Sequence, residues 1–503
     1  MISTYLRLLQ LELAHIRRKG GIAAAEEFLT SCSERYRQPE LKVKVALERA
    51  KLSYLTGKWD DCLSLLDKVE LHDHLLQPED RAYFFITSAR LHYCYGDLNQ
   101  SLAFLEMALG EAEETGPAGI ETCLEMASLF NRIGEQERGD DFLQRAEQLL
   151  QENPVPRLAS RLAFERGLVY LRTEGITEAR EFFEESLTLL KSIKPSVSRG
   201  EGLRFLGILE AMDSRPLEAL EYQKSALDCF QALPYPFGAA KAFNSLGQTC
   251  MQLGRFEEAQ LFLQKAEEIC RELGAEAERA MILGKLGAVF SKKGDFEKAI
   301  TYQKQDLDLS SRFGNYRALA FSLRNLGLSY KAKGDLAKAV KYLRDSRDRF
   351  SELEDYAYLV KADLDLVSAL LEHDRITEAF GFLQDAQEHL ERRMEVTSDH
   401  VNARYYAGLI SFHTEKYHQA EKFLWQTLEM CQPFGMHARQ ADIHYHLAKL
   451  YLTKRDPGAA QLEFMSAYRL SVRHSLGELR RECAEQLMEL DPEGFFQELL
   501  LPG

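Results

Sequence analysis

Apolar side chains recur along this chain in pairs of helical stripes separated by short polar turns. One pair in the middle of the chain is formed by Phe243, Leu246, Cys250, Ala259, Leu263 and Ala266. Spacings of three and four residues place side chains on one face of an α-helix. The pattern therefore predicts two amphipathic helices, here termed helix A and helix B, joined by a tight turn.

The same pair repeats through the central part of the chain. Leu-Gly dipeptides recur without gaps every 40 residues, at Leu206-Gly207, Leu246-Gly247, Leu286-Gly287 and Leu326-Gly327. An alanine follows each glycine twelve residues later, at Ala219, Ala259, Ala299 and Ala339. A spacing that does not drift over four units indicates an array of helical hairpins, in which each unit packs on its neighbours.

The register extends in weaker form toward both ends, with spacings of 37 to 41 residues. The helix-A position is taken by Ala50, Ala89, Ala127, Gly167, Val367, Gly408 and Ala448. The helix-B position is taken by Cys62, Ser101, Gly139, Ala179, Ala379, Ala420 and Ala460. Leu13 and Ala25 indicate one further unit at the start. The sequence thus predicts an all-α solenoid of about twelve hairpins.

Glycine has two roles in the predicted hairpin. Inside helix A it costs about 0.5–1 kcal/mol relative to alanine, which a closer approach of helix B can offset. In the turn, as at Gly254, Gly294 and Gly334, it can adopt the left-handed conformation that ends helix A. Asp295 and Asp335 then stand where a side chain can cap helix B.

These features together resemble the tetratricopeptide repeat. The pattern of that repeat has Leu-Gly, an aromatic residue three positions later (Phe290 and Tyr330 here), an alanine, and a second small residue seven positions further on. The usual repeat has about 34 residues, and the 40-residue form resembles the repeats of Pins-type polarity adaptors and of bacterial signalling regulators. The resemblance covers nearly the whole chain. It implies a right-handed superhelical solenoid whose concave, helix-A-lined surface holds an extended or helical peptide.

The last residues depart from the repeat. Residues 477–489 form one more amphipathic helix without a partner pattern, and the segment 491–494, Asp-Pro-Glu-Gly, ends it. A terminal repeat needs such a helix to cover its open apolar face. We therefore predict a solenoid over residues 1–470, followed by a C-terminal capping helix and tail over residues 471–503.

Composition and charge narrow the possible classes of function. A net charge of −15 argues against a general nucleic-acid binder, and no apolar run reaches the length that spans a bilayer. The nine cysteines are scattered, and none forms a Cys-x-x-Cys pair, which favours packing residues in a reducing compartment. The chain enters an amphipathic helix directly, without a signal-peptide core. We expect a cytoplasmic protein that neither inserts into a membrane nor binds nucleic acid directly.

No catalytic or metal-binding pattern stands out from the background. The sequence has no phosphate loop, no Gly-x-Gly-x-x-Gly and no Gly-x-Ser-x-Gly. His437, His444 and His446 are the best metal candidates, but residues two apart on a helix point in different directions, and no carboxylate–histidine motif completes a site. We expect no catalytic residue, no metal and no cofactor.

In the tetratricopeptide fold, helix-A positions near the Leu-Gly glycine face the concave groove. The polar residues there are Arg204, Lys241, Asn244, Gln248, Lys285, Arg324, Asn325 and Lys331. Amide side chains can hold the backbone of an extended peptide, and Arg and Lys can hold its carboxylates, although a merely solvated groove would also be polar. The flanking units carry aromatic residues at these positions, namely Tyr83, Tyr93, Tyr405, Tyr406, Phe412 and Tyr445. These either anchor an apolar group of a ligand or pack between adjacent A helices.

The predicted function is that of a non-catalytic adaptor or regulator that binds a segment of a partner protein in the groove. The basic residues on helix A favour an acidic or amphipathic segment. An alternative is a receptor for a small ligand or a signalling peptide, which changes the shape of the superhelix on binding and so regulates a partner. An enzyme is the least favoured class, because the sequence carries no catalytic motif.

Overall fold

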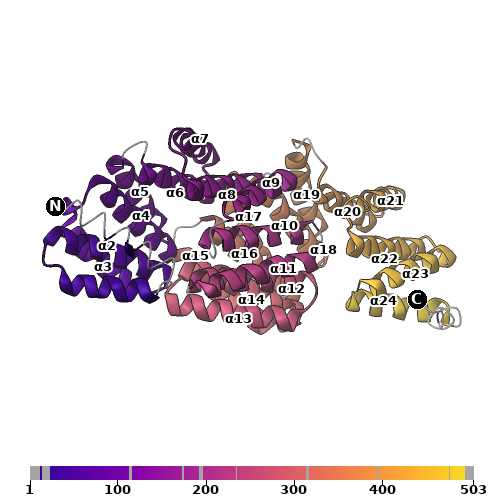
Figure 1. Cartoon of the computed structure of the whole chain (residues 1–503). Coiled ribbons are helices and arrows are strands. Elements are labelled where there is room, and N and C mark those ends of the chain that lie inside the picture. Colours follow the sequence, from indigo (N-terminus) through magenta and orange to yellow (C-terminus); the bar gives the residue numbers. More distant parts are fainter. Residues whose placement is uncertain are drawn as a thin grey trace. The chain divides into compact units, whose positions relative to one another are not determined.

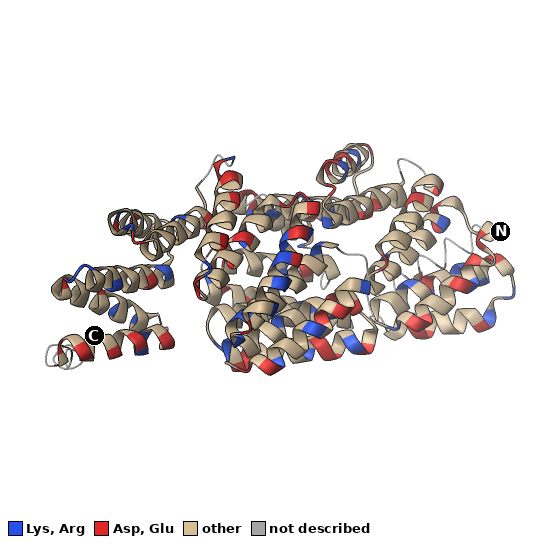
Figure 2. Cartoon of the chain, turned by 180° about the vertical axis from the view of Figure 1, so that it is seen from behind, with Lys and Arg blue, Asp and Glu red and all other residues tan. Residues whose placement is uncertain are grey.

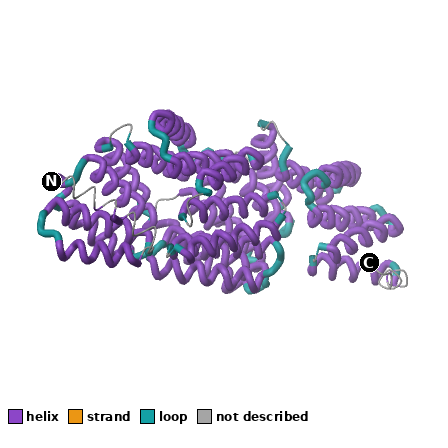
Figure 3. Tube along the Cα trace, viewed as in Figure 1, coloured by secondary structure: helices purple, strands orange, loops and turns teal. Residues whose placement is uncertain are grey.

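The computed structural model of the chain consists of α-helices and short connections. It describes residues 9, 12–13, 23–112, 116–172, 175–191, 196–213, 215–233, 235–312, 316–392, 396–474, 476–492 and 495. Within these residues there is one short 3-10 helix, Asp73–Leu75, and no strand (Figure 3). The prediction of an all-α fold is confirmed.

Antiparallel helix pairs follow one another along the chain (Figure 1). The A helices are α2 (Pro39–Leu55), α4 (Pro78–Tyr95), α6 (Pro117–Ile133), α8 (Pro156–Arg172), α10 (Val197–Met212), α12 (Pro236–Gln252), α14 (Glu276–Lys292), α16 (Tyr316–Lys333), α18 (Tyr356–Leu371), α20 (Ser398–His413) and α22 (His437–Thr453). The B helices are α3 (Trp59–Glu70), α5 (Leu98–Glu111), α7 (Gln136–Glu152), α9 (Ile176–Leu189), α11 (Pro216–Ala232), α13 (Phe256–Leu273), α15 (Phe296–Arg312), α17 (Leu336–Glu352), α19 (Ile376–Glu391), α21 (Tyr417–Cys431) and α23 (Pro457–Arg473). A last helix, α24 (Gly477–Leu490), has no partner of this kind.

Eleven complete hairpins therefore lie in the part of the chain that the structure describes. They are preceded by a helical stretch over residues 23–35, in which Ala25 and Leu29 are buried together with Leu13. Most of helix A of the first predicted hairpin lies outside the described residues. The hairpin architecture is otherwise the one that the sequence predicted.

The helices form two compact units, Met1–Ser322 and Leu323–Gly503, with the boundary inside α16. The first unit contains the hairpins from α2 to α15, and the second contains α17 to α24. The 40-residue repeat continues through this boundary between the two units, so the sequence pattern did not predict the boundary. The division into a solenoid over 1–470 and a cap with a tail over 471–503 stays a prediction.

The glycines inside helix A lie so close to helix B that no larger side chain fits there. A Cβ atom on Gly247 would be 2.6 Å from Cγ of Leu263, and one on Gly287 would be 2.5 Å from Cγ of Gln303. The glycines of the other two Leu-Gly dipeptides are similarly placed. The close approach of the two helices offsets the helix-weakening effect of glycine, as predicted.

The turns between helices A and B also match the prediction. Gly254, Gly294 and Gly334 have φ angles of 70°, 80° and 85°, in the left-handed region that glycine favours. The carboxylates of Asp295 and Asp335 each accept a hydrogen bond of 3.2 Å from the backbone N–H three residues later. These contacts end one helix and start the next, which fixes the tight turn.

Hairpins that are distant in the sequence meet within the first unit. Trp59, at the start of α3, packs edge-on against Phe237 of α12, with ring centroids 5.3 Å apart, and also against Tyr95 of α4. Gly57, in the turn before α3, leaves room for Pro236, because a Cβ atom on it would lie 2.7 Å from Pro236 Cγ. Helices α2 to α4 thereby share one apolar core with α12 to α14. Since the array closes on itself in this way, the A helices in between surround an interior space.

In the second unit, α24 covers the end of the last hairpin. Cys483 and Leu487 of α24 are fully buried and pack with Phe464 and Ala467 of α23. Phe495, beyond the helix, joins the same cluster. A helix is thus present over the predicted residues 477–489 and packs on the last hairpin, whereas its role as a cap stays a prediction.

Charged side chains of both signs are interspersed along the helices (Figure 2). Several form ion pairs one turn apart on the same helix, such as Arg312 with Asp308 at 2.5 Å. None of the described helices combines the length and the apolar character that crossing a bilayer requires.

Candidate functional site: an interior cavity of the first unit

A cavity of about 400 Å³ lies inside the first unit. Its lining comes mainly from the A helices α4, α6, α8, α10 and α12, with contributions from the end of α2 and from α5. The walls combine aromatic and aliphatic side chains with charged groups of both signs. A partly apolar pocket of this size with a few convergent polar groups is typical of ligand-binding sites.

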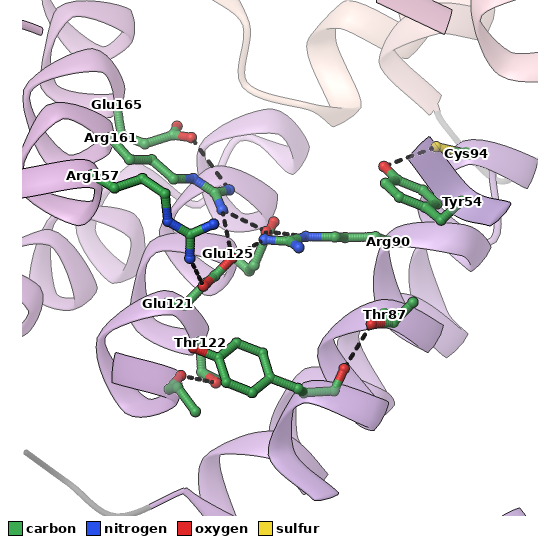
Figure 4. A network of polar contacts seen from close by, with 12 residues as sticks. Tyr54, Thr87, Arg90, Cys94, Glu121, Thr122, Glu125, Arg157, Arg161 and Glu165 are labelled. Atoms are coloured by element: carbon green, nitrogen blue, oxygen red, sulfur yellow. Dashed lines mark hydrogen bonds and ion pairs between the residues drawn. The ribbon is translucent and has the colours of Figure 1, made fainter. Parts of the chain in front are cut away.

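Five charged side chains from three neighbouring A helices form a network on the cavity wall (Figure 4). Arg90 of α4 donates hydrogen bonds to Glu121 and Glu125 of α6, both at 2.5 Å. Arg157 of α8 reaches Glu121 at 2.8 Å, and Arg161 reaches Glu125 at 2.7 Å. Each glutamate is therefore held between arginines of two different helices. This arrangement ties the three hairpins together around the cavity.

The arginines keep these glutamates ionised. Burial alone would raise the pKa of Glu125, but Arg161 and Arg90 outweigh it and lower the pKa to about 2. The pKa of Glu121 is also lowered, because its arginine neighbours outweigh the effect of burial. In Glu201 of α10 two basic neighbours again overcome burial and bring the pKa to about 2. The three carboxylates are charged at any physiological pH.

Two further charged groups of the cavity are less completely paired. Glu165 of α8 is only 3 % exposed, and its Oε2 atom has no hydrogen-bond partner within the described chain. A guanidinium nitrogen of Arg161 lies 3.9 Å from its Oε1 atom, beyond hydrogen-bond distance. Burial raises the pKa of Glu165, and the positive charges of Arg161 and Arg132 offset only part of that rise.

Arg132 of α6 is the second such group. Its guanidinium carbon lies 4.9 Å from the ring centroid of Tyr93, and it donates a hydrogen bond to the hydroxyl of the same tyrosine. Among the described residues, no carboxylate lies within 4 Å of it. Arg132 therefore presents a positive charge to the cavity without a bound counter-charge.

Aromatic side chains form much of the remaining wall. They are Tyr54, Tyr93, Phe164, Tyr235 and Phe237. The hydroxyl of Tyr54 lies 3.6 Å from the sulfur of Cys94, so that one edge of this wall is polar. Rigid amphipathic rings beside paired charges suit the recognition of a short segment that has both apolar and charged groups.

One of the predicted groove residues, Lys241, lines this cavity, as does the predicted aromatic residue Tyr93. The ammonium group of Lys241 lies 3.6 Å from Glu201 and 4.4 Å from the ring centroid of Phe237. Arg204 pairs with Glu201 at 2.7 Å, within the same helix. The positive charge expected on α10 and α12 is thus offset by a glutamate that the sequence prediction did not consider.

Three other predicted residues of the first unit form a chain of hydrogen bonds between neighbouring A helices. Lys285 of α14 donates to Asn244 at 2.8 Å and to Gln248 at 2.7 Å, both on α12. Asn244 in turn donates to Glu278 at 3.0 Å. Burial lowers the pKa of Lys285 to about 8. The two amides are occupied by these contacts, which hold adjacent A helices together.

The remaining predicted residues lie in the second unit. Arg324 pairs with Asp365 at 2.6 Å, and Lys331 lies 2.7 Å from both Ser368 and Glu372. Asn325 is half-buried on the same helix. The eight predicted residues therefore divide between two units, and only those of the first belong to the surroundings of the cavity.

The aromatic residues predicted on flanking A helices have different surroundings. Tyr405 is 4 % exposed, lies under the guanidinium of Arg439 at 4.2 Å, and bonds with His446 of the next A helix. Tyr83 is half-buried under the ammonium group of Lys51. For Tyr405 the structure favours packing between adjacent A helices over an exposed anchor.

The three histidines considered for metal binding have separate partners. His444 lies 2.6 Å from Glu463, and His437 stacks on His474. His446 forms hydrogen bonds with the backbone carbonyl of Asp442 in its own helix and with the hydroxyl of Tyr405. Burial lowers the pKa of His446 to about 4. No group of three or more His, Cys, Asp and Glu side chains in the described part of the chain has the arrangement of a metal site.

The residues of the charged network and Glu165 were not predicted, although the sequence carried a signal for Glu125 and Glu165. In the central units several of the predicted polar groove residues, such as Arg204 and Lys285, stand two or three residues before the Leu-Gly glycine, whereas only aromatic groove residues were considered in the flanking units. Glu125 stands two residues before Ala127, and Glu165 stands two residues before Gly167. The same rule, applied to the units nearer the N-terminus, would have found both. The pairing of Arg90 with α6 depends on packing and had no signal in the sequence.

Comparison with known families agrees with the hairpin geometry. Residues 198–272 and 278–352 match the family model of the tetratricopeptide repeat. Over these residues the chain consists of tetratricopeptide repeats. Tetratricopeptide repeats stack into extended arrays, and here the A helices of the first unit line the cavity.

Solved structures that match this chain include three with low sequence identity. A Rap protein complexed with competence and sporulation factor is 16 % identical, covers 76 % of this chain and 100 % of its own, and has a TM-score of 0.45. BtubC from P. vanneervenii is 21 % identical over 46 % of this chain and 91 % of its own, with a TM-score of 0.33. A putative kinesin light chain with tetratricopeptide-like repeats, from Podosopora anserina, is 17 % identical over 39 % and 98 %, with a TM-score of 0.33. At these values the similarity carries no information about what this tetratricopeptide-repeat protein binds.

Proposed function

We propose that this tetratricopeptide-repeat protein is a non-catalytic regulator or adaptor that binds a short segment of a partner protein or peptide in the interior cavity of its first unit. The observation that carries the proposal is the cavity itself, with about 400 Å³ of space between A helices and a lining of aromatic and charged side chains. These features provide apolar contact area together with fixed charges that can orient a segment.

Binding explains the electrostatics of the cavity better than catalysis does. Glu121 and Glu125 have lowered pKa values and stay ionised, so that they do not exchange protons near neutral pH. Burial raises the pKa of the Cys94 thiol to about 11, which leaves it a poor nucleophile. These charged groups are suited to holding a ligand rather than to acid–base or nucleophilic chemistry.

The segment that fits has mixed charge. Arg132 and the largely exposed Arg157 can contact an acidic group of the segment. The proposed ligand therefore retains part of the acidic or amphipathic character that the sequence predicted. The residues predicted from the sequence, above all Lys241 with Arg204 beside it, extend this surface along α10 and α12. Asn244, Gln248 and Lys285 then hold the adjacent helices in register, and Arg324, Asn325 and Lys331 belong to a second surface in the other unit.

A receptor for a small ligand or a signalling peptide is the second candidate, and the closure of the first unit favours it. Trp59 and Phe237 join hairpins that are far apart in the sequence, next to the cavity residues Tyr235 and Lys241. A ligand that displaces this contact would change the pitch of the array and the surface seen by a partner. A screen of ligands by thermal shift, with no partner present, separates this candidate from the adaptor.

We propose a cytoplasmic location, with no direct contact to nucleic acid and no membrane insertion. All nine cysteines are buried and unpaired, which suits a reducing compartment. The acidic net charge of −15 disfavours binding to a polyanion.

The test is a selection of seven-residue peptides from a random displayed library against the full chain, followed by a matched pair of blocking variants. Ser198→Trp places an indole at the cavity lining on α10, whereas Ser225→Trp places the same group on the exposed face of α11. We expect the selected peptides to bind the wild type and Ser225→Trp equally, and to lose at least about tenfold in affinity for Ser198→Trp, with both variants folded. Equal binding by the two variants would remove the cavity as the site.

A further inference from the structure

We propose that Glu165 is the specificity-determining residue of the cavity, and that it binds a positively charged group, an ammonium or a guanidinium, of the segment held there. The inference rests on the proposed function, because it assumes that a segment enters the cavity. It adds a requirement to the expected acidic or amphipathic segment, namely that the ligand carries at least one cation.

The pairing of the other carboxylates singles out Glu165. Glu121 and Glu125 each have two arginines within 2.8 Å, and Glu201 has Arg204 at 2.7 Å. Glu165 shares a side-chain hydrogen bond with Ser128, and the nearest cation among the described residues is Arg161, at 3.9 Å, whose hydrogen bonds go to Glu125. Of these cavity carboxylates, Glu165 is therefore the one without a close cation, and its Oε2 atom is left for a ligand.

Because Glu165 is buried, the lack of a partner for its Oε2 atom is energetically significant. The side chain lines the cavity while the residue is only 3 % exposed, and Oε2 has no hydrogen-bond partner among the residues described. A buried anionic oxygen without a partner is destabilising, and a cation that arrives in the cavity removes that penalty. A neutral group of the same shape leaves the charge uncompensated, so the carboxylate discriminates by charge.

Arg132 would determine the orientation in which the segment binds. It lies on the adjacent A helix, faces the same cavity, and acts electrostatically on Glu165 without touching it. Its positive charge repels a cation from its own side and attracts an acceptor oxygen of the segment. A segment therefore enters with its cation toward α8 and a carbonyl or carboxylate oxygen toward α6, which distinguishes one chain direction from the other.

The experiment uses pools of seven-residue peptides in which one position is fixed as Lys, Arg, norleucine or Glu and the others vary. Norleucine keeps the methylene chain of lysine and removes only the charge. Each pool is made with a free and with an acetylated amino terminus, and binding to the full chain is measured by fluorescence anisotropy. We expect Lys or Arg at one position to bind at least about tenfold more tightly than norleucine. Retention of this preference after acetylation assigns the cation to a side chain, whereas a preference that depends on the free terminus assigns it to the α-amino group.

The matched variants are Glu165→Gln and Glu257→Gln. The first keeps the shape of the side chain and removes its charge, and the second makes the same change at a site on α13 that is 82 % exposed. We expect Glu165→Gln to bind the charged and uncharged pools equally, and Glu257→Gln to behave as the wild type. The comparison of Lys and norleucine on the wild type needs no variant, so the proposal stays testable if Glu165→Gln does not fold.

Failure of the inference and failure of the proposed function give different results. If the wild type binds norleucine pools as tightly as lysine pools with either terminus, or if Glu165→Gln keeps the preference for lysine, the role of Glu165 is wrong while the cavity remains the site. If no pool shows binding that Ser198→Trp abolishes, the cavity is not the site and both proposals fall.

Discussion

Asp306 offers a direct test of how burial shapes the energetics of this array. It lies on α15, is 4 % exposed, and occupies the helix-B position at which other hairpins have Ala226, Ala266 and Ala386. Ser310 donates a hydrogen bond of 3.1 Å to it, and Ser322 also forms a hydrogen bond with it. No cation in the described part of the chain pairs with it, and burial raises its pKa from 3.8 to about 7. We predict that Asp306→Ala stabilises the protein above neutral pH.

The magnitude follows from the pKa. Because the folded-state pKa of Asp306 lies above its unfolded value, the folded state loses stability as pH rises from about 4 to about 7, and the loss is complete above the folded pKa. At about 1.4 kcal/mol per pKa unit, the charged carboxylate costs roughly 4 kcal/mol at pH 8. Loss of its hydrogen bonds removes about 1–2 kcal/mol of the benefit. The expected gain for Asp306→Ala is therefore about 2–3 kcal/mol at pH 8, and about 2–3 kcal/mol less at pH 5.

The assay is urea unfolding of the wild type, Asp306→Ala and Asp308→Ala at pH 5 and pH 8. Asp308 is on the same helix but largely exposed, where it pairs with Arg312, so its replacement should change stability by about 0.5 kcal/mol or less. A stabilisation of Asp306→Ala that appears at pH 8 and vanishes at pH 5 supports the reasoning. Destabilisation at pH 8, or an equal change at both pH values, would refute it.

Two further predictions concern packing and the end of the array. Gly247→Ala should destabilise the protein by about 1–3 kcal/mol in thermal unfolding, because the new methyl group meets Leu263. The control, Gly381→Ala on α19, has open space around it and should stabilise the protein by up to about 1 kcal/mol. An unchanged stability of Gly247→Ala would show that the close approach of the two helices is not needed. Deletion of residues 471–503 should uncover Phe464 and promote aggregation in light scattering, and a truncated chain that stays monomeric with an unchanged melting temperature would remove α24 as a cap.

Much of the fold could be predicted from the sequence because each hairpin is specified locally. The repeat glycines, the turn glycines and Asp335 act on neighbours within one unit, so the 40-residue pattern contains the information. The capping helix was also visible, as an amphipathic stretch without a partner. The contact of Trp59 with Phe237 could not be predicted, because it depends on how small rotations between units accumulate until distant hairpins meet.

The candidate site was predicted only in part, for the same reason. Helix-A positions were the right place to look, and Lys241 and Tyr93 do line the cavity. The prediction of a basic groove did not take acidic neighbours into account. Glu201 pairs with Arg204, and Asp365 pairs with Arg324. Reversing the charge of either arginine should destabilise the fold, because it places two negative charges side by side.

The central claim, that the interior of the first unit binds a segment, is tested most directly by hydrogen exchange of the full chain with and without the tightest selected heptapeptide. The account predicts slower exchange in α4, α6, α8 and α10, whose side chains line the cavity, with little change in α17 to α24. Protection confined to the second unit, or to the exposed faces of the B helices, would contradict it.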